Sequence, residues 1–198
     1  MNDYEVRKIR EIFARIFVIA IDNKINFYSF TNFLLKSEFL EQLEKNKYSK
    51  IFDMPIEDIF FSITGYDIEE DKSYGIYNDA YWSGQSYFDL HEKLHKSFAY
   101  LFLKLPLEQM INIYSIYHEM DFSLLCDYFL KVEKQKTILN ILCKNKHCSL
   151  NDISIATSLS LNTLKKYNSS DDALFKASFQ NIAKLVEYFD VSYSLFIY

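Results

Sequence analysis

Hydrophobic side chains recur along this chain at the three- and four-residue spacing of amphipathic helices. The clearest stripe lies in residues 3–22, where Val6, Ile9, Phe13 and Ile16 fall on one face. Comparable patterns predict further helices within 26–46, from Pro55, over 78–104, from Pro106, from Asp121, and over 135–146, 177–189 and 192–197. The chain is therefore predicted to be built from helices.

Glycine and proline are scarce enough to support this prediction. The 198 residues contain three Gly and two Pro, and no Gly follows Gly84. A chain with so few helix-breaking residues can form long helices with few tight turns. We therefore expect an all-α fold, with an N-terminal multi-helix domain followed by a five-helix domain.

Two adjoining helices with a short turn between them are predicted for residues 149–167. Ser149 and Asp152 have the spacing of a capping box at the start of the first helix. Ser158 occupies the turn, and Ser160 is placed to cap the second helix. In that second helix the apolar residues Leu164 and Tyr167 face inward. The residues left facing outward are Leu161, Asn162, Lys165 and Lys166.

This arrangement is typical of a helix-turn-helix, whose second helix lies in the major groove of double-stranded DNA. We expect Lys165 and Lys166 to contact phosphate or guanine, and Asn162 to contact a base edge. The hydroxyls of Ser160 and Thr163 are expected to contact the DNA backbone.

Three features of the same stretch favour a protein-interaction module instead. Leu150 stands where many such domains place a phosphate-binding Gln. Ser158 replaces the usual turn Gly, so it must hold a strained backbone. Asp171 and Asp172 follow closely and would repel phosphates. Both alternatives are carried forward.

The charge of the chain is divided unevenly. Residues 131–198 hold nine Lys and six acidic residues, a net +3, so with a total of −5 residues 1–130 carry −8. A basic C-terminal part on an acidic body suits a DNA reader with a separate dimerisation or partner-binding domain. The positive excess is small, which favours a homodimer on a palindromic operator. No Pro or Gly linker marks the boundary near residue 130, which predicts a continuous or nearly continuous helix there.

The cellular setting is suggested by what the chain lacks. Three Cys form no even disulfide framework and no signal peptide is recognisable, which favours the cytoplasm. The apolar run at 13–21 is too short to cross a bilayer, so no membrane segment is expected.

The sequence HEKLH at 91–95 is the strongest indication of an enzyme. On a helix, His91 and His95 would share a face and could bind zinc, with Glu92 activating a water. The ammonium groups of Lys93 and Lys96 count against a cation at this place. A zinc hydrolase is therefore a remote alternative.

Two resemblances bear on these alternatives. KASFQNIAKLVEYFDVSYSLF (176–196) resembles the closing helices of the Cro/C1 (XRE-type) helix-turn-helix family, so the resemblance extends over 135–198. Residues 80–121 resemble an uncharacterised Firmicutes-type helical protein family whose members often end in an XRE-type domain. The residues that carry this second resemblance are Tyr81, Trp82, Gly84, Ser97, Phe98, Pro106, Tyr114, His118, Glu119 and Asp121.

The matching stretch of that family has no counterpart of His91 or His95, which weakens the zinc hypothesis. We therefore expect no catalytic residues, no metal and no cofactor. The resemblance implies a DNA-binding regulator, or an antitoxin-like protein with a cognate partner, in a small mobile-element operon. The alternative is a protein-binding neutraliser, such as an antitoxin or a phage-borne inhibitor of a defence enzyme.

Overall fold

The computed structural model describes residues 3–45, 51, 53–68 and 77–196, and in these residues it contains helices and no strand. The all-α prediction is therefore confirmed. The N-terminal helices are α1 (Asp3–Asp22), α2 (Phe27–Lys36), α3 (Glu38–Glu44), α4 (Ile56–Thr64), α5 (Asn78–Leu94), α6 (Phe98–Lys104), α7 (Leu107–Tyr117) and α8 (Phe122–Val132). The C-terminal helices are α9 (Ile138–Lys146), α10 (Leu150–Thr157), α11 (Leu161–Ser169), α12 (Asp171–Phe175), α13 (Phe179–Phe189) and the 3₁₀-helix η1 (Tyr193–Phe196).

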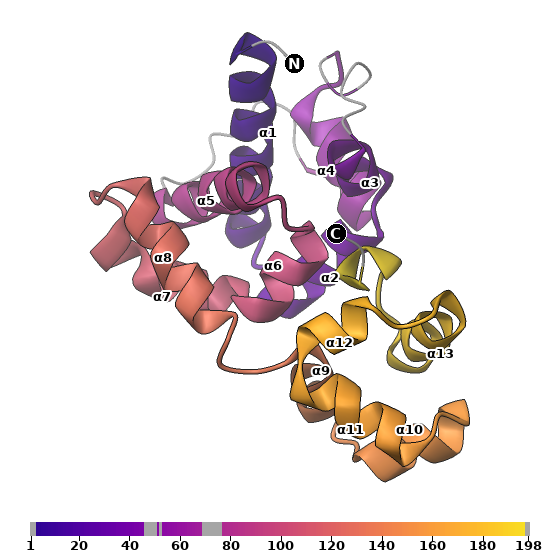
Figure 1. Cartoon of the computed structure of the whole chain (residues 1–198). Coiled ribbons are helices and arrows are strands. Elements are labelled where there is room, and N and C mark those ends of the chain that lie inside the picture. Colours follow the sequence, from indigo (N-terminus) through magenta and orange to yellow (C-terminus); the bar gives the residue numbers. More distant parts are fainter. Residues whose placement is uncertain (1–2, 46–50, 52, 69–76, 197–198) are drawn as a thin grey trace.

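The N-terminal unit is organised around the contact between α1 and α5 (Figure 1). Gly84 makes this contact close, because a Cβ at its position would lie 2.6 Å from the Cα of Ala14. Phe13 and Phe17 of α1 are fully buried beside the contact. Their rings pack against those of other helices, with Phe13 4.9 Å from Phe98 between centroids. The predicted apolar stripe of residues 3–22 thus forms the centre of the core.

The predicted long helix over 78–104 is wrong, because one helix ends at Leu94 and another begins at Phe98. His95 adopts a left-handed conformation (φ 53°) after Leu94. Ser97 then caps α6 by accepting a hydrogen bond from the backbone N–H of Tyr100. This cap satisfies an amide at the new helix start and turns the chain into a second helix.

The boundary near residue 130 is a turn, so the predicted continuous helix is also wrong. Helix α8 ends at Val132 and α9 begins after its cap, Thr137. The ammonium of Lys104 in α6 stabilises this turn, since it donates hydrogen bonds to the backbone oxygens of Glu133 and Lys136. These bonds satisfy carbonyl groups that would otherwise lack partners where α8 ends.

The C-terminal unit packs on the N-terminal unit through several contacts. The last element, η1, lies against α6 (Figure 1). Lys104 forms a buried ion pair with Asp171, with 2.6 Å between Nζ and Oδ2. Lys36 forms an exposed ion pair with Asp190, at 3.1 Å. No described helix is both long and apolar enough to cross a bilayer.

Candidate nucleic-acid interface

The first helix of the predicted helix-turn-helix, α10, starts at the predicted capping box. The hydroxyl of Ser149 accepts a hydrogen bond from the backbone N–H of Asp152. The carboxylate of Asp152 accepts one in return from the backbone N–H of Ser149, at 2.8 Å. This second bond also lowers the pKa of Asp152. The start of α10 is therefore fixed by residues of its own first turn.

The turn between α10 and α11 has the conformation that the sequence predicts. Ser158 adopts a left-handed backbone, with φ of 57°. Leu159 is buried beneath the turn. The hydroxyl of Ser154 donates a hydrogen bond to the backbone oxygen of Leu159, at 2.6 Å. The side chain of Ser154 therefore ties α10 to the turn.

The second helix, α11, is held by its inward face and its cap. Leu164 is fully buried and Tyr167 is buried. Ser160 caps the helix, because its hydroxyl accepts from the backbone N–H of Thr163. The two hydroxyl oxygens of Ser160 and Thr163 also lie 2.8 Å apart in a hydrogen bond. These two hydroxyls thus bond to each other at the start of α11.

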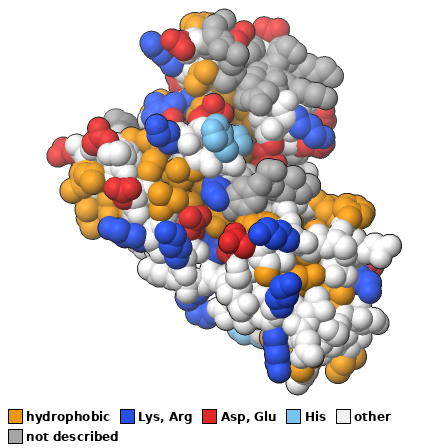
Figure 2. Space-filling model, viewed as in Figure 1, with side chains coloured by type: hydrophobic (Ala, Val, Ile, Leu, Met, Phe, Trp, Pro, Cys, Tyr) orange, Lys and Arg blue, Asp and Glu red, His pale blue; other side chains and the backbone are white. Residues whose placement is uncertain are grey.

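The outward face of α11 carries three of the five predicted DNA-binding residues. Asn162, Lys165 and Lys166 are all exposed. Their spacing of three and four residues places them on one side of the helix. Leu161, predicted to face outward, is half-buried. Figure 2 shows Lys side chains on the visible face of the C-terminal unit.

The two acidic residues after α11 do not behave alike. Asp171 accepts a hydrogen bond from the backbone N–H of Ile138 at 2.7 Å, in addition to its ion pair with Lys104. The ion pair with Lys104 therefore neutralises the charge of Asp171, and the hydrogen bond that it accepts from Ile138 caps the start of α9. Asp172 remains exposed. The expected repulsion of phosphates is thus reduced to one carboxylate.

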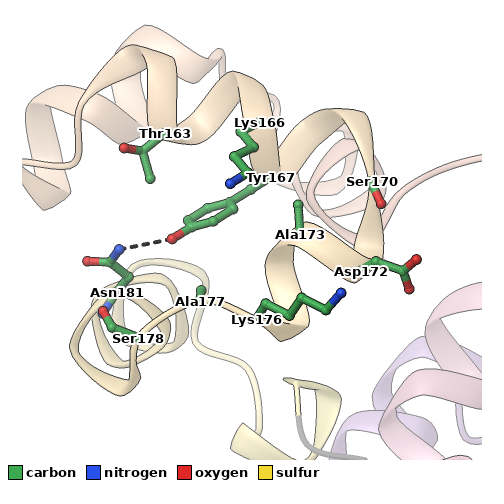
Figure 3. Close-up of a pocket in the computed structure, with 10 residues that line it drawn as sticks. All are labelled: Thr163, Lys166, Tyr167, Ser170, Asp172, Ala173, Lys176, Ala177, Ser178 and Asn181. Carbon is green, nitrogen blue, oxygen red and sulfur yellow. Dashed lines mark hydrogen bonds between the residues drawn. The ribbon is translucent and has the colours of Figure 1, made fainter.

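A pocket of about 600 Å³ lies beside α11, and the sequence did not reveal it. Lys166 and Tyr167 of α11 line one side (Figure 3). Lys176, which follows α12, and Asn181 of α13 line the other. The side-chain amide of Asn181 donates a hydrogen bond to the hydroxyl of Tyr167, at 2.9 Å. The short helix α12, which was not predicted, supplies a wall of this pocket.

The HEKLH residues do not all lie on one helix, as the remote zinc alternative would require. Helix α5 ends at Leu94, so His95 lies beyond it in a left-handed conformation. The Nδ1 atom of His91 is hydrogen bonded to the backbone oxygen of Lys96 at 2.7 Å. Its ring stacks on Phe98, with 4.3 Å between centroids. His91 thus serves the turn between α5 and α6. Among the described residues, no three His, Cys, Asp or Glu side chains converge as metal ligands would.

The three cysteines are free thiols. Cys143, in the last turn of α9, is half-buried. Burial raises the pKa of its thiol to about 12, with further contributions from the neighbouring Cys148. Burial also raises the pKa of the Cys126 thiol. Neither thiol has the lowered pKa of a catalytic nucleophile.

In comparisons with known proteins, no family model, no curated protein and no solved structure matches this chain.

Proposed function

We propose that this chain is a DNA-binding transcriptional regulator that places α11 in the major groove of a palindromic operator. The observation that carries the proposal is the exposed Asn162, Lys165 and Lys166 face on the second helix of the α10–α11 pair. Lysine suits phosphate and guanine, and the Asn amide suits the donor and acceptor edge of adenine. The resemblance of residues 135–198 to XRE-type domains supports the same function.

The hydroxyls of Ser160 and Thr163 support the proposal at the start of the helix. Both lie at the N-terminal end of α11, where backbone N–H groups are left without helical partners. A DNA phosphate at this end would meet those amides, the positive end of the helix dipole and the two hydroxyls. In this role the two residues orient the end of α11 toward the DNA backbone.

An exposed apolar patch supports protein contact by the N-terminal unit. Ile116 and Leu124 lie on either side of the turn between α7 and α8, and Met120 lies in that turn. These side chains are 55%, 47% and 48% exposed, respectively. Figure 2 shows hydrophobic side chains gathered over α7 and α8. In the proposed regulator this patch joins two copies, and two copies double the number of phosphate contacts.

The proposal is tested by selecting bound DNA from a random pool with the full chain. A recovered palindrome gives the operator and the dimer geometry together. The variant Lys165→Glu/Lys166→Glu should then bind that operator roughly 100-fold more weakly, because two contacts are lost. The matched control is Lys144→Glu/Lys184→Glu, which changes the net charge equally at exposed positions outside α11. Equal binding by both variants, insensitive to salt, would refute the proposal.

A second candidate is a protein-binding neutraliser, favoured by the α7–α8 patch and by the −8 charge of residues 1–130. An acidic unit with an exposed apolar patch fits a basic groove on a partner protein. This candidate predicts that the full chain recovers one basic protein and shows no affinity for DNA at low salt. It also predicts that Met120→Ser weakens the capture and that Lys165→Glu/Lys166→Glu does not.

A further inference from the structure

The pocket beside α11 contains hydrogen-bond donors that have no acceptor among the described residues. Within the described residues, the ammonium groups of Lys166 and Lys176 form no ion pair. Tyr167 is only 6% exposed, and its hydroxyl accepts the bond from Asn181. That leaves the hydroxyl proton of Tyr167 without a protein acceptor among the same residues. A buried donor in this position is expected to meet an acceptor from outside the chain, which can be water or a ligand that replaces it.

The charge and shape of the pocket indicate what that acceptor would be. Two ammonium groups and one carboxylate, Asp172, line it, so its net charge is +1. In Figure 3 the carboxylate of Asp172 is turned away from Lys166, and the side chain of Lys176 extends toward Asp172 without forming an ion pair. Ala173, Ala177 and the ring of Tyr167 supply apolar walls. A volume of about 600 Å³ is in the range of pockets that hold small organic ligands, and exceeds what one inorganic ion fills.

We propose that this pocket binds a small phosphate-bearing organic molecule. Its phosphate would accept hydrogen bonds from Lys166, Lys176 and the hydroxyl of Tyr167, and its organic part would lie against the two alanines. Since Lys166 also belongs to the DNA-reading face of α11, the bound molecule competes with the operator. This competition rests on the proposed function, whereas the binding of the molecule does not.

The binding is tested by nuclear magnetic resonance on the full chain, with adenosine 5′-monophosphate and inorganic phosphate as the probes. The side-chain amide of Asn181 should shift saturably with the nucleotide, with a Kd on the order of 1 mM or below. Lys176→Gln should weaken this binding about tenfold, because one charged hydrogen bond is lost. Lys144→Gln, which removes an exposed charge outside the pocket, should leave it unchanged. No saturable shift, or equal weakening by both variants, would overturn the proposal.

The competition is tested by fluorescence anisotropy with the selected operator. The nucleotide should release DNA from the wild-type chain at concentrations near its own Kd and should require about tenfold more for Lys176→Gln. Saturable nucleotide binding without any DNA binding would preserve the pocket and refute the regulator. DNA binding without a nucleotide shift would preserve the regulator and refute the pocket. Loss of operator binding in Lys176→Gln, with no nucleotide shift in the wild type, would assign the pocket to a DNA backbone phosphate and overturn the small-molecule ligand.

Discussion

The buried ion pair between Lys104 and Asp171 should hold the two units of the chain together. The side chain of Lys104 is 1% exposed, and its ammonium also bonds the carbonyls of Glu133 and Lys136. Replacing Lys104 by Met leaves the Asp171 carboxylate, whose side chain is 17% exposed, without its counter-charge. Removing one partner of a buried pair usually lowers the free energy of unfolding by about 3–5 kcal/mol. For a chain of this size that corresponds to a fall in Tm on the order of 10 °C.

The chain provides its own control for this measurement. Lys36 and Asp190 form a second Lys–Asp pair between the same two units, but their side chains are 66% and 84% exposed. Lys36→Met should therefore change the free energy of unfolding by less than about 1 kcal/mol. Thermal and urea unfolding, followed by circular dichroism, compare the two variants. Equal effects of Lys104→Met and Lys36→Met would refute the reasoning, because burial would then not determine the contribution of the pair.

Three further outcomes are expected from individual residues. Gly84→Ala should lower the free energy of unfolding by about 2 kcal/mol, because its Cβ would meet the backbone of Ala14 at 2.6 Å; thermal unfolding checks this. Ser158→Gly should raise that free energy by about 1 kcal/mol in urea unfolding, because Gly relieves a φ of 57°. At pH 8, Cys143 should be alkylated roughly 30-fold more slowly in the folded than in the unfolded chain, since raising its pKa from 9.0 to about 12 lowers the thiolate fraction more than it raises thiolate nucleophilicity; mass spectrometry of the labelled peptide checks this.

The sequence predicted the helix pair α10–α11 and its turn well because their determinants are local. The capping box of Ser149 and Asp152, the cap at Ser160 and the left-handed turn at Ser158 each depend on residues within four positions. Apolar spacing likewise placed Leu164 and Tyr167 on the buried face of α11. Such features are encoded in short stretches, so they can be predicted without knowing what the helix packs against.

The failed predictions depended on contacts between residues far apart in the sequence. The long helix over 78–104 ends early, and α6 starts where the carboxylate of Glu44 accepts a bond from the backbone N–H of Phe98. The expected helix across residue 130 is interrupted where Lys104 binds two carbonyls from 29 and 32 residues away. Neither break contains a Gly or a Pro, so the usual helix-breaking residues did not mark them. The pocket went unpredicted because its lining comes from three helices, one of which, α12, was not predicted.

The position of Asp171 links the stability of the fold to the proposed reading of DNA. This residue caps α9 and binds Lys104, and it directly follows the cap residue that ends α11. The C-terminal end of α11 is therefore anchored to the N-terminal unit. On the proposed function, a dimer formed by the α7–α8 patch would then fix the separation of its two α11 helices. Half-sites one helical turn apart require recognition helices about 34 Å apart, so a rigid anchor favours one operator spacing over others. The sequence suggested that Asp171 would weaken DNA binding. On the proposed function, Asp171 instead orients α11, the helix that binds the DNA.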